Sequence, residues 1–190
     1  ALEQFYEWLA PVANARLTFS YIADRNFLVK NIETDPPEMQ SPSVGTVRVR
    51  FVYEAWAYKV MTDTTLTIGN FATLAQASTL LCYPAFAITN ATAGVYRISR
   101  GASIASPYTY MDVTLSSDNF YVDTGKMIAW RTYGTTKSNM SHYVSGDYAD
   151  FVYGKNAKYQ NYAFGFSKPS GSSGSNNAVL TITWNWRALL

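Results

Sequence analysis

The chain has 190 residues and a formal net charge of +2, a length typical of one domain that can bury a substantial hydrophobic core. Its Lys and Arg residues form no run, which excludes a flexible polybasic arm for nucleic acid, and its one cysteine, Cys82, excludes a disulfide-stabilised secreted scaffold. Charged residues make up only 15%, and 15 residues are tyrosines. Either much of the surface contacts other protein, or a Tyr/Ser/Thr-rich β surface needs few charges. No apolar run approaches the ~20 residues of a membrane span, and no signal peptide is visible.

The N-terminal segment predicts a short amphipathic helix. Apolar side chains recur at helical spacing over residues 2–9, and Pro11 ends the run. One short helix is not stable alone, so it must dock on its own domain or on a neighbouring subunit. We therefore predict an N-terminal arm over residues 1–14 and a single domain over residues 15–190.

The stretch 45–60 predicts a long, bent strand around which the other strands are arranged. Apolar and charged side chains alternate from Val47 to Glu54, which is the period of a half-buried strand. The alternation slips near Ala55, which indicates a bulge or a change of layer. Residues 16–22 and 26–32 predict two earlier strands.

The rest of the chain predicts more strands and one helix. Asn70 is a candidate N-cap for a helix over residues 70–81, and Asp123-Thr-Gly predicts a hairpin turn. Residues 134–150 and 167–177 predict loops with little regular structure. Strands are predicted at 64–68, 80–88, 94–99, 108–115, 120–122, 127–133, 151–153, 159–166 and 178–186.

These elements predict an all-β fold. Strands at regular spacing, with turn residues between them, are typical of a sandwich or a barrel. Long connections and this chain length favour an eight-stranded jelly-roll β-sandwich with one or two short helices and long loops.

No motif predicts catalysis, a metal site or a cofactor. His142 is the sole histidine, and no strained nucleophile elbow accompanies it. One His and one Cys cannot build a typical structural zinc site, and the acidic residues are too sparse for calcium. Cys82 has no cationic neighbour and predicts a buried, inert thiol. We therefore expect a binding or structural protein rather than an enzyme, with no cofactor.

Four arginines are candidates for weak contact with RNA phosphate. Arg48 and Arg50 alternate with apolar residues in the stretch 45–60, and Arg97 and Arg100 flank Ser99. The four could form a mild basic patch. Outward strand arginines paired with Asp or Glu are the commoner arrangement, and this alternative stays open.

The order of these features resembles the jelly-roll coat proteins of picorna-like viruses. The resemblance rests on a strand that opens Gly-Thr-Val-Arg-Val-Arg-Phe, a helix over 70–81, Ser106-Pro107-Tyr108 before a strand, and a closing hairpin over 162–186. It covers roughly residues 15–190 and is one of pattern rather than of a diagnostic motif. The size is similar to that of the small coat proteins of plant picorna-like viruses, in particular cheravirus-like members of the secovirus family.

The resemblance implies a capsid protein. In such viruses three related jelly rolls, cut from a polyprotein, build an icosahedral shell around the RNA genome, and a start at Ala1 suits such cleavage. The implied partners are the other capsid proteins of the virus and, weakly and non-specifically, the enclosed RNA, with no membrane. The implied location is the virion, and the host cell cytoplasm during assembly.

Subunit contacts are expected at the N-terminal segment and at the two long loops. The candidates are Leu2, Phe5, Tyr6, Trp8, Leu9, His142 and Tyr143. The alternative is a non-viral jelly roll that binds a ligand, lectin-like or tumour-necrosis-factor-like, whose aromatic loops would stack on sugars. An enzyme of unfamiliar type comes third.

Overall fold

The computed structural model describes residues 15–189, except 23–24, 42–43, 55, 60, 74–77, 117–118, 134–135, 160–162 and 186. The chain divides into two compact units. The first runs to Val60 and includes the residues from Ala188 on, and the second is Met61–Arg187. The sequence predicted one domain over 15–190, whereas the structure has two units there. The predicted arm over 1–14, with its helix, lies outside the described residues.

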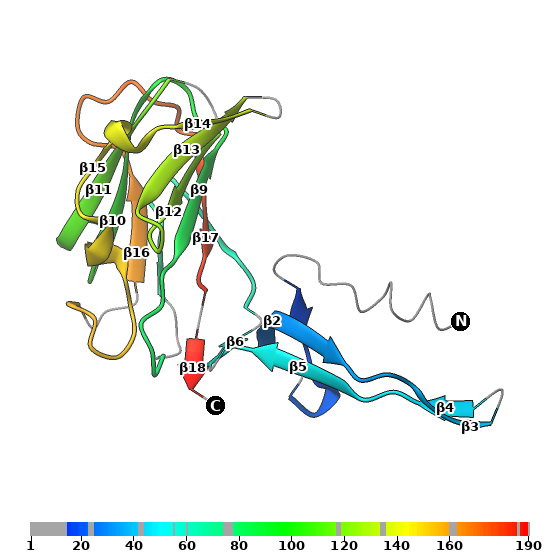
Figure 1. The fold of residues 1–190 in the computed structure, drawn as a ribbon. Coiled ribbons are helices and arrows are strands. Elements are labelled where there is room, and N and C mark those ends of the chain that lie inside the picture. The colour runs from blue at the N-terminus through cyan, green and yellow to red at the C-terminus, as the bar shows by residue number, and fades with distance from the viewer. Residues whose placement is uncertain are drawn as a thin grey trace. The chain divides into compact units, whose positions relative to one another are not determined.

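The second unit is a β-sandwich of two antiparallel sheets (Figure 1). One sheet has the order β14-β13-β12-β9-β17-β7, and the other has the order β15-β11-β10-β16-β8. The first comprises Thr136–Asn139, Ile128–Tyr133, Phe120–Asp123, Ala85–Thr89, Val179–Thr183 and Thr64–Thr67 in that order. The second comprises Val144–Ser145, Pro107–Leu115, Gly94–Gly101, Ala163–Ser167 and Phe71–Thr73.

The strand order is that of a jelly roll. When β7 to β12, β16 and β17 are counted in chain order, one sheet holds the first, eighth, third and sixth strands side by side. The other sheet holds the second, seventh, fourth and fifth. Eight strands arranged this way form a double-sheet jelly roll, so the predicted all-β sandwich is confirmed. In this unit β13, β14 and β15 extend the two sheets.

The core of the second unit lies between the sheets. Alternate residues of β17 point inward, so Leu180 and Ile182 are buried while Thr181 between them is half-exposed, and β9 follows the same pattern. Phe164 of β16 packs against Phe86 at a ring separation of 5.5 Å and against Trp184 at 5.5 Å. The period-two pattern read from the sequence is therefore the pattern that builds this core.

The first unit is a small sheet that continues into a two-stranded ribbon, in which the chain from Lys30 to Ser41 runs beside the chain from Val44 to Tyr53. Its sheet runs β1-β2-β6-β18, with β5 also paired to β2. Phe27 is buried at its base, where its ring meets those of Phe19 at 5.4 Å and Tyr53 at 5.1 Å. The elements are β1 Arg16–Leu17, η1 Ser20–Ile22, β2 Arg25–Thr34, β3 Glu38–Ser41, β4 Val44–Thr46, β5 Val49–Tyr53, β6 Trp56–Lys59 and β18 Arg187–Leu189.

The stretch 45–60 does not form one strand of the sandwich. It contributes the end of β4, then β5 and β6, and all three belong to the first unit. β5 ends at Tyr53 and β6 begins at Trp56, and the predicted slip in the alternation falls between them. The strand predicted over 16–22 is also shorter, because η1, a 3-10 helix, follows β1.

The helix predicted over 70–81 is wrong at its start. Phe71–Thr73 is strand β8, which pairs with β16 through Gly165 and Phe71. Asn70 does not cap a helix: its side-chain amide donates to Thr67 Oγ1 at 2.6 Å in the turn between β7 and β8. Pairing with a distant strand has overridden a local capping signal. Residues 74–77 are not described.

The segment 134–150 is more regular than predicted. It contains β14, β15 and the 3-10 helix η2 Ser141–Tyr143. A second 3-10 helix, η3 Tyr148–Phe151, begins within the segment and ends one residue beyond it. The hairpin turn at Asp123 is confirmed, since Asp123 Oδ1 accepts from the amides of Gly125 and Lys126 at 3.0 Å each. Across the described part of the chain, no helix has the length and apolar character needed to span a membrane.

Candidate functional site

Arg48 and Arg50 lie on the ribbon of the first unit and are exposed. Each is already ion-paired across the ribbon, Arg48 with Asp35 at 3.6 Å and Arg50 with Glu33 at 3.0 Å. The alternative that the sequence left open, in which outward strand arginines pair with acidic residues, therefore holds for both Arg48 and Arg50. Their positive charge is offset by neighbouring carboxylates, which weakens any attraction for phosphate.

Arg97 is also paired with an acid. It lies on β10 in the second unit and makes two 2.7 Å hydrogen bonds to the carboxylate of Asp112 on β11. Its guanidinium also sits over the ring of Tyr110, 3.7 Å from the centroid. The hydrogen bonds to Asp112 raise the pKa of Arg97 above its ordinary value. A bidentate pair of this kind fixes the guanidinium in place on the sheet.

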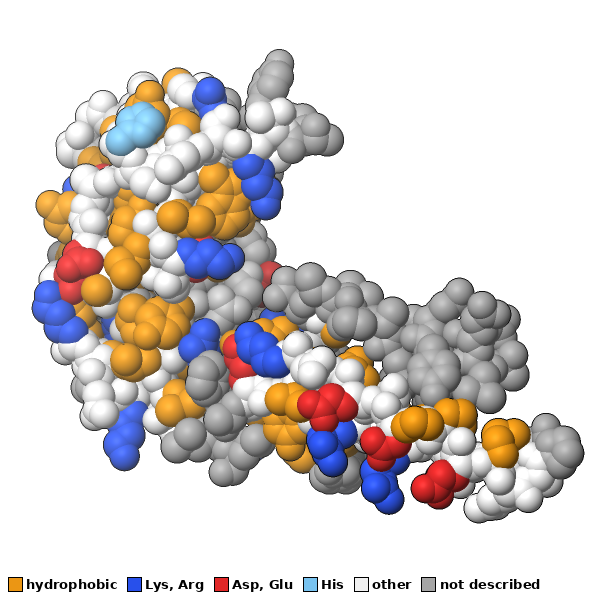
Figure 2. All heavy atoms as spheres, viewed as in Figure 1, with side chains coloured by type: hydrophobic (Ala, Val, Ile, Leu, Met, Phe, Trp, Pro, Cys, Tyr) orange, Lys and Arg blue, Asp and Glu red, His pale blue; other side chains and the backbone are white. Residues whose placement is uncertain are grey.

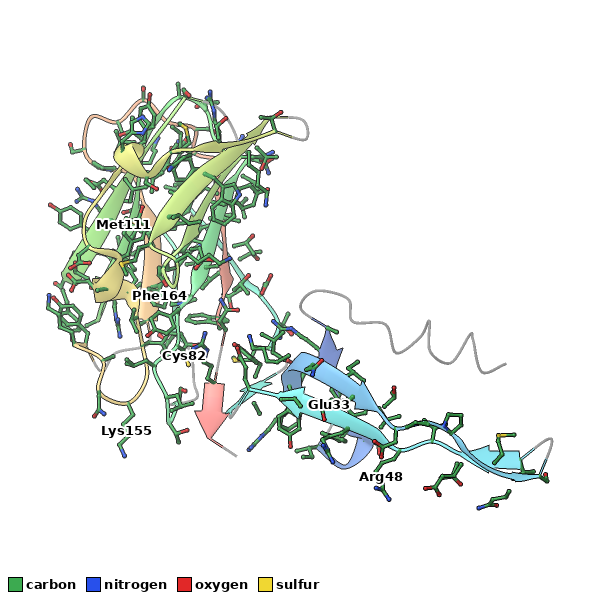
Figure 3. All side chains as sticks on the ribbon, in the orientation of Figure 1. Glu33, Arg48, Cys82, Met111, Lys155 and Phe164 are labelled. Carbon is green, nitrogen blue, oxygen red and sulfur yellow. The ribbon has the colours of Figure 1, made fainter. Side chains whose placement is uncertain are left out.

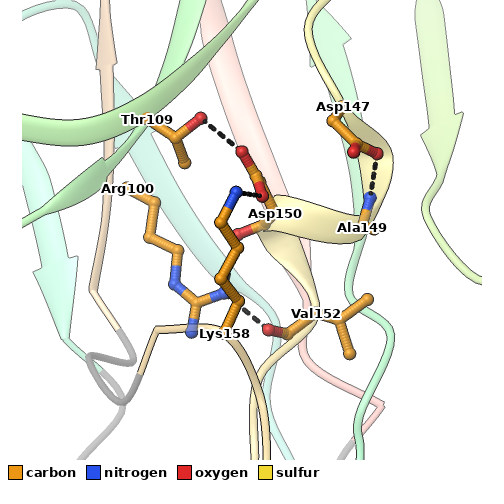
Figure 4. Close-up of polar contacts among 7 residues, drawn as sticks. All are labelled: Arg100, Thr109, Asp147, Ala149, Asp150, Val152 and Lys158. Atoms are coloured by element: carbon orange, nitrogen blue, oxygen red, sulfur yellow. Dashed lines mark hydrogen bonds and ion pairs between the residues drawn. The ribbon is translucent and has the colours of Figure 1, made fainter.

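Arg100 is not available to RNA, which corrects the sequence-based assignment. It is fully buried, and it donates to the carbonyl oxygens of Asp150 at 2.8 Å, Val152 at 2.5 Å and Tyr159 at 2.6 Å. Figure 4 shows the guanidinium aimed at the segment that follows η3. Arg100 therefore supplies donors to backbone carbonyls that would otherwise be buried without partners.

The carboxylate of Asp150 completes this cluster. It accepts from Thr109 Oγ1 at 3.0 Å and from Lys158 Nζ at 2.6 Å (Figure 4). Asp147 caps η3 by accepting from the amide of Ala149 at 2.9 Å. Every polar group drawn in this cluster has a partner within the protein. We therefore interpret the cluster as a device that holds η3 and the segment to Tyr159 against the sandwich.

Of the predicted subunit contacts, the structure describes His142 and Tyr143. Both lie in η2 and are exposed, with ring centroids 4.0 Å apart. Leu2, Phe5, Tyr6, Trp8 and Leu9 lie outside the described residues. The loop 167–177 uses its polar groups internally: Ser172 Oγ accepts from the amide of Val95 at 2.9 Å and donates to its carbonyl at 2.7 Å.

A shallow cleft lies at the β13–β14 edge of the first sheet. It has a volume of about 300 Å³ and includes Trp130, Lys126 and Lys137 in its lining. Tyr121 stacks on Trp130 at a ring separation of 5.5 Å, and Lys137 Nζ lies 5.5 Å from the Trp130 centroid. Sequence reasoning missed this cleft, although Trp130 alternates with buried Ala129 along a predicted strand.

The described residues contain no group of three or more His, Cys, Asp or Glu that could hold a metal ion. Cys82 is buried, as predicted, and burial raises the pKa of its thiol above the ordinary value. A buried, protonated thiol is a poor nucleophile. That the chain is not an enzyme stays a prediction.

The ribbon of the first unit exposes apolar side chains. Met39 and Val44 at its tip are 53% and 54% exposed, and Val52 and Tyr53 nearer its base are also exposed. Figure 2 shows hydrophobic and charged side chains interspersed on the described part of this unit. These apolar side chains are scattered among charged ones rather than gathered in one contiguous patch.

No protein-family model matches the chain, and no curated protein matches it. Among solved structures, the chain is similar to the SPP1 Dit (gp 19.1) protein, described as a paradigm of the hub adsorption apparatus in phages that infect Gram-positive bacteria. The TM-score is 0.45 at 9% identity, over 95% of this chain and 68% of that one. A TM-score below 0.5 at this identity does not establish a shared fold.

Proposed function

We propose that the chain is a viral capsid protein that assembles with related jelly-roll subunits into an icosahedral shell around an RNA genome. The strand order of the second unit carries the proposal, because a complete eight-stranded jelly roll gives the rigid body that a shell subunit needs. The resemblance to coat proteins of plant picorna-like viruses supports it. Its location would be the virion, and the host cell cytoplasm during assembly.

The outer face of the first sheet supports a role in contacts with other proteins. Its central row, read from the strand register, is Asn139, Trp130, Tyr121, Ala87, Thr181 and Thr65. No residue of this row carries a charge. A broad sheet face of uncharged side chains, with two aromatic rings among them, is suited to burial against a neighbouring subunit, and this accounts for part of the low charge of the chain.

Contact with the enclosed RNA would be weak and non-specific. Arg48, Arg50 and Arg97 can present guanidinium groups to phosphate, but each already has a carboxylate partner. Arg100 is excluded by its burial. Neutralisation of the genome would therefore depend on other subunits or on cations as well.

Sedimentation of the native material with negative-stain microscopy tests the proposal. We expect spherical particles that sediment far faster than a single chain and contain this chain with one or two companions of similar size. A monomer or a compact trimer under every condition tried would overturn it.

The cleft beside Trp130 favours the second candidate, a ligand-binding jelly-roll module. A Trp ring, two lysines and the Asn139 amide are groups that bind sugars or anionic ligands. A glycan-binding screen of the full chain and of Trp130→Ala tests it. Binding by the native chain that the variant loses would support this function, and retention of no glycan would reject it.

A further inference from the structure

The ribbon of the first unit has open edges among the described residues. β5 pairs with β2 alone, over a register that includes Glu33 opposite Arg50 and Thr34 opposite Val49. On the other side of β2, the β1 partners are Phe27 and Leu28 only. The described chain therefore offers one free row of backbone groups on β5 and another on β2 from Lys30 to Thr34. Free rows of this kind bind additional strands.

The two faces of the ribbon differ in character. Ile32 and Phe51 lie opposite one another on one face and are half-buried, while Glu33 and Arg50 lie on the other face and are exposed. A two-stranded ribbon in water is marginally stable at best. Additional strands at its edges would widen the apolar face and supply the missing ladder bonds.

The two strands of the ribbon carry side chains of opposite charge. The outgoing chain carries Glu33 and Asp35, and the returning chain carries Arg48 and Arg50; Figure 3 labels Glu33 and Arg48. The order reverses only at the base, where Lys30 pairs with Glu54 at 2.8 Å. The outer half of the ribbon thus has an acidic edge and a basic edge.

We infer that the ribbon binds the same ribbon of a second copy of this chain, with β5 of one copy beside β2 of the next. The contact repeats the antiparallel register that β5 and β2 use within one chain. It places Arg50 of one copy between its own Glu33 and that of its neighbour, so charges alternate along the row. Pairing β5 with β5 would oppose arginines, and pairing β2 with β2 would oppose acids, both of which destabilise a sheet.

Such a contact is heterologous, because different edges of the two copies meet. Heterologous contacts repeat from copy to copy and close into a ring when the rotation permits. The inference rests on the proposed function: it places copies of this chain next to one another around a rotation axis of the shell. The neighbouring copy would also extend the apolar face that Ile32 and Phe51 form.

Disulfide trapping between copies tests the contact. Thr34→Cys and Val49→Cys are made in separate full-length chains, which are assembled together and oxidised. Thr34 and Val49 are register partners, so the proposed contact brings the two new cysteines within disulfide distance only between copies. We expect several-fold more linked dimer in this mixture than in either variant alone. The unsubstituted chain, whose one cysteine is buried, controls for Cys82.

A mixture of Thr34→Cys with Val52→Cys is the matched control. Val52 is the register partner of Asn31, three residues from Thr34, which is too far for a disulfide. Linking no stronger than this control, in material that still forms large particles, would overturn the edge contact and leave the capsid proposal standing. Material that never forms a large assembly would overturn both.

A charge exchange gives a second measurement. The double variant Glu33→Arg, Arg50→Glu keeps an opposite-charge pair inside each ribbon but reverses which edge is acidic. With Thr34→Cys and Val49→Cys carried on separate chains, we expect two exchanged chains to link with each other and an exchanged chain to link several-fold less with an unexchanged one. Equal linking in both mixtures would show that charge does not select the edge partner.

Discussion

The two units use the same period-two alternation to different ends. In the sandwich, inward side chains such as Phe164 and Ile98 meet a second sheet and are completely buried. In the ribbon, Phe51 and Ile32 alternate equally well but stay half-exposed, since no second layer among the described residues covers them. Alternation therefore specifies which face is apolar, whereas burial depends on whether another layer is present.

The largest expected effect comes from the sandwich core. Phe164→Ala removes a fully buried ring that packs against the rings of Phe86, Phe151 and Trp184. We expect the free energy of unfolding of the second unit to fall by roughly 3–5 kcal/mol, because such a truncation leaves a cavity. Urea unfolding followed by tryptophan fluorescence measures this.

Phe51→Ala in the ribbon is the matched comparison. Its ring is half-exposed, so the same truncation removes less buried area, and we expect a loss of about 1 kcal/mol or less. Equal losses for the two variants would mean that the ribbon is as well packed as the sandwich. That result would contradict the contrast between the two units.

Replacing the buried arginine should rank next. Arg100→Met leaves the carbonyls of Asp150, Val152 and Tyr159 without these donors, and we expect a loss on the order of 3 kcal/mol. Arg97→Met is the control: its ion pair with Asp112 is part-exposed, so we expect a loss of about 1 kcal/mol. Thermal unfolding of both variants checks the order, and a larger loss for Arg97→Met would reject the role assigned to Arg100.

Much of the sandwich could be predicted from its sequence because its strands are patterned locally. The strand predicted over 178–186 alternates strictly, and it forms β17 in the interior of a sheet. The Asp123 turn carries its own hydrogen-bonding side chain. Both features depend on residues within a few positions of one another, which sequence reading detects.

The failures arise where distant residues decide the outcome. The segment at Phe71 becomes a strand because β16 lies beside it, about 90 positions along the chain, which no N-cap signal reveals. The burial of Arg100 depends on the carbonyls of residues 150–159, which lie at least 50 positions away in the sequence. Nothing in the alternation of 45–60 shows that these strands belong to a unit separate from the sandwich, whose described residues place no second layer over Phe51.

High pH should weaken the folded state modestly through Cys82. Burial raises the pKa of this thiol, so the folded chain keeps the proton while the unfolded chain releases it above about pH 9. Stability from this source is therefore complete below pH 9 and is lost as pH rises further. Urea midpoints at increasing pH should therefore fall less steeply for Cys82→Ala than for the native chain. Burial also raises the pKa of Tyr148. This residue is present in both the native chain and Cys82→Ala, so it does not contribute to the difference between them.

The smallest effect on folding should come from the ribbon tip. Met39→Ser with Val44→Ser changes two exposed side chains, so we expect the free energy of unfolding to change by no more than about 0.5 kcal/mol. If copies meet along the ribbon, however, the same variant should lower the fraction of assembled material, because the tip loses its apolar contacts. Quantitative sedimentation measures that fraction.

Met127→Ser separates this effect from a general loss of apolar surface. Met127 is 63% exposed in the β12–β13 turn of the second unit and is not part of the ribbon. We expect it to leave both folding and assembly unchanged. If it reduced assembly as much as the tip variant, the ribbon would have no special part in binding. If only the tip variant reduced assembly, the position of the exposed apolar side chains on the ribbon would decide assembly. The total amount of exposed apolar surface would not.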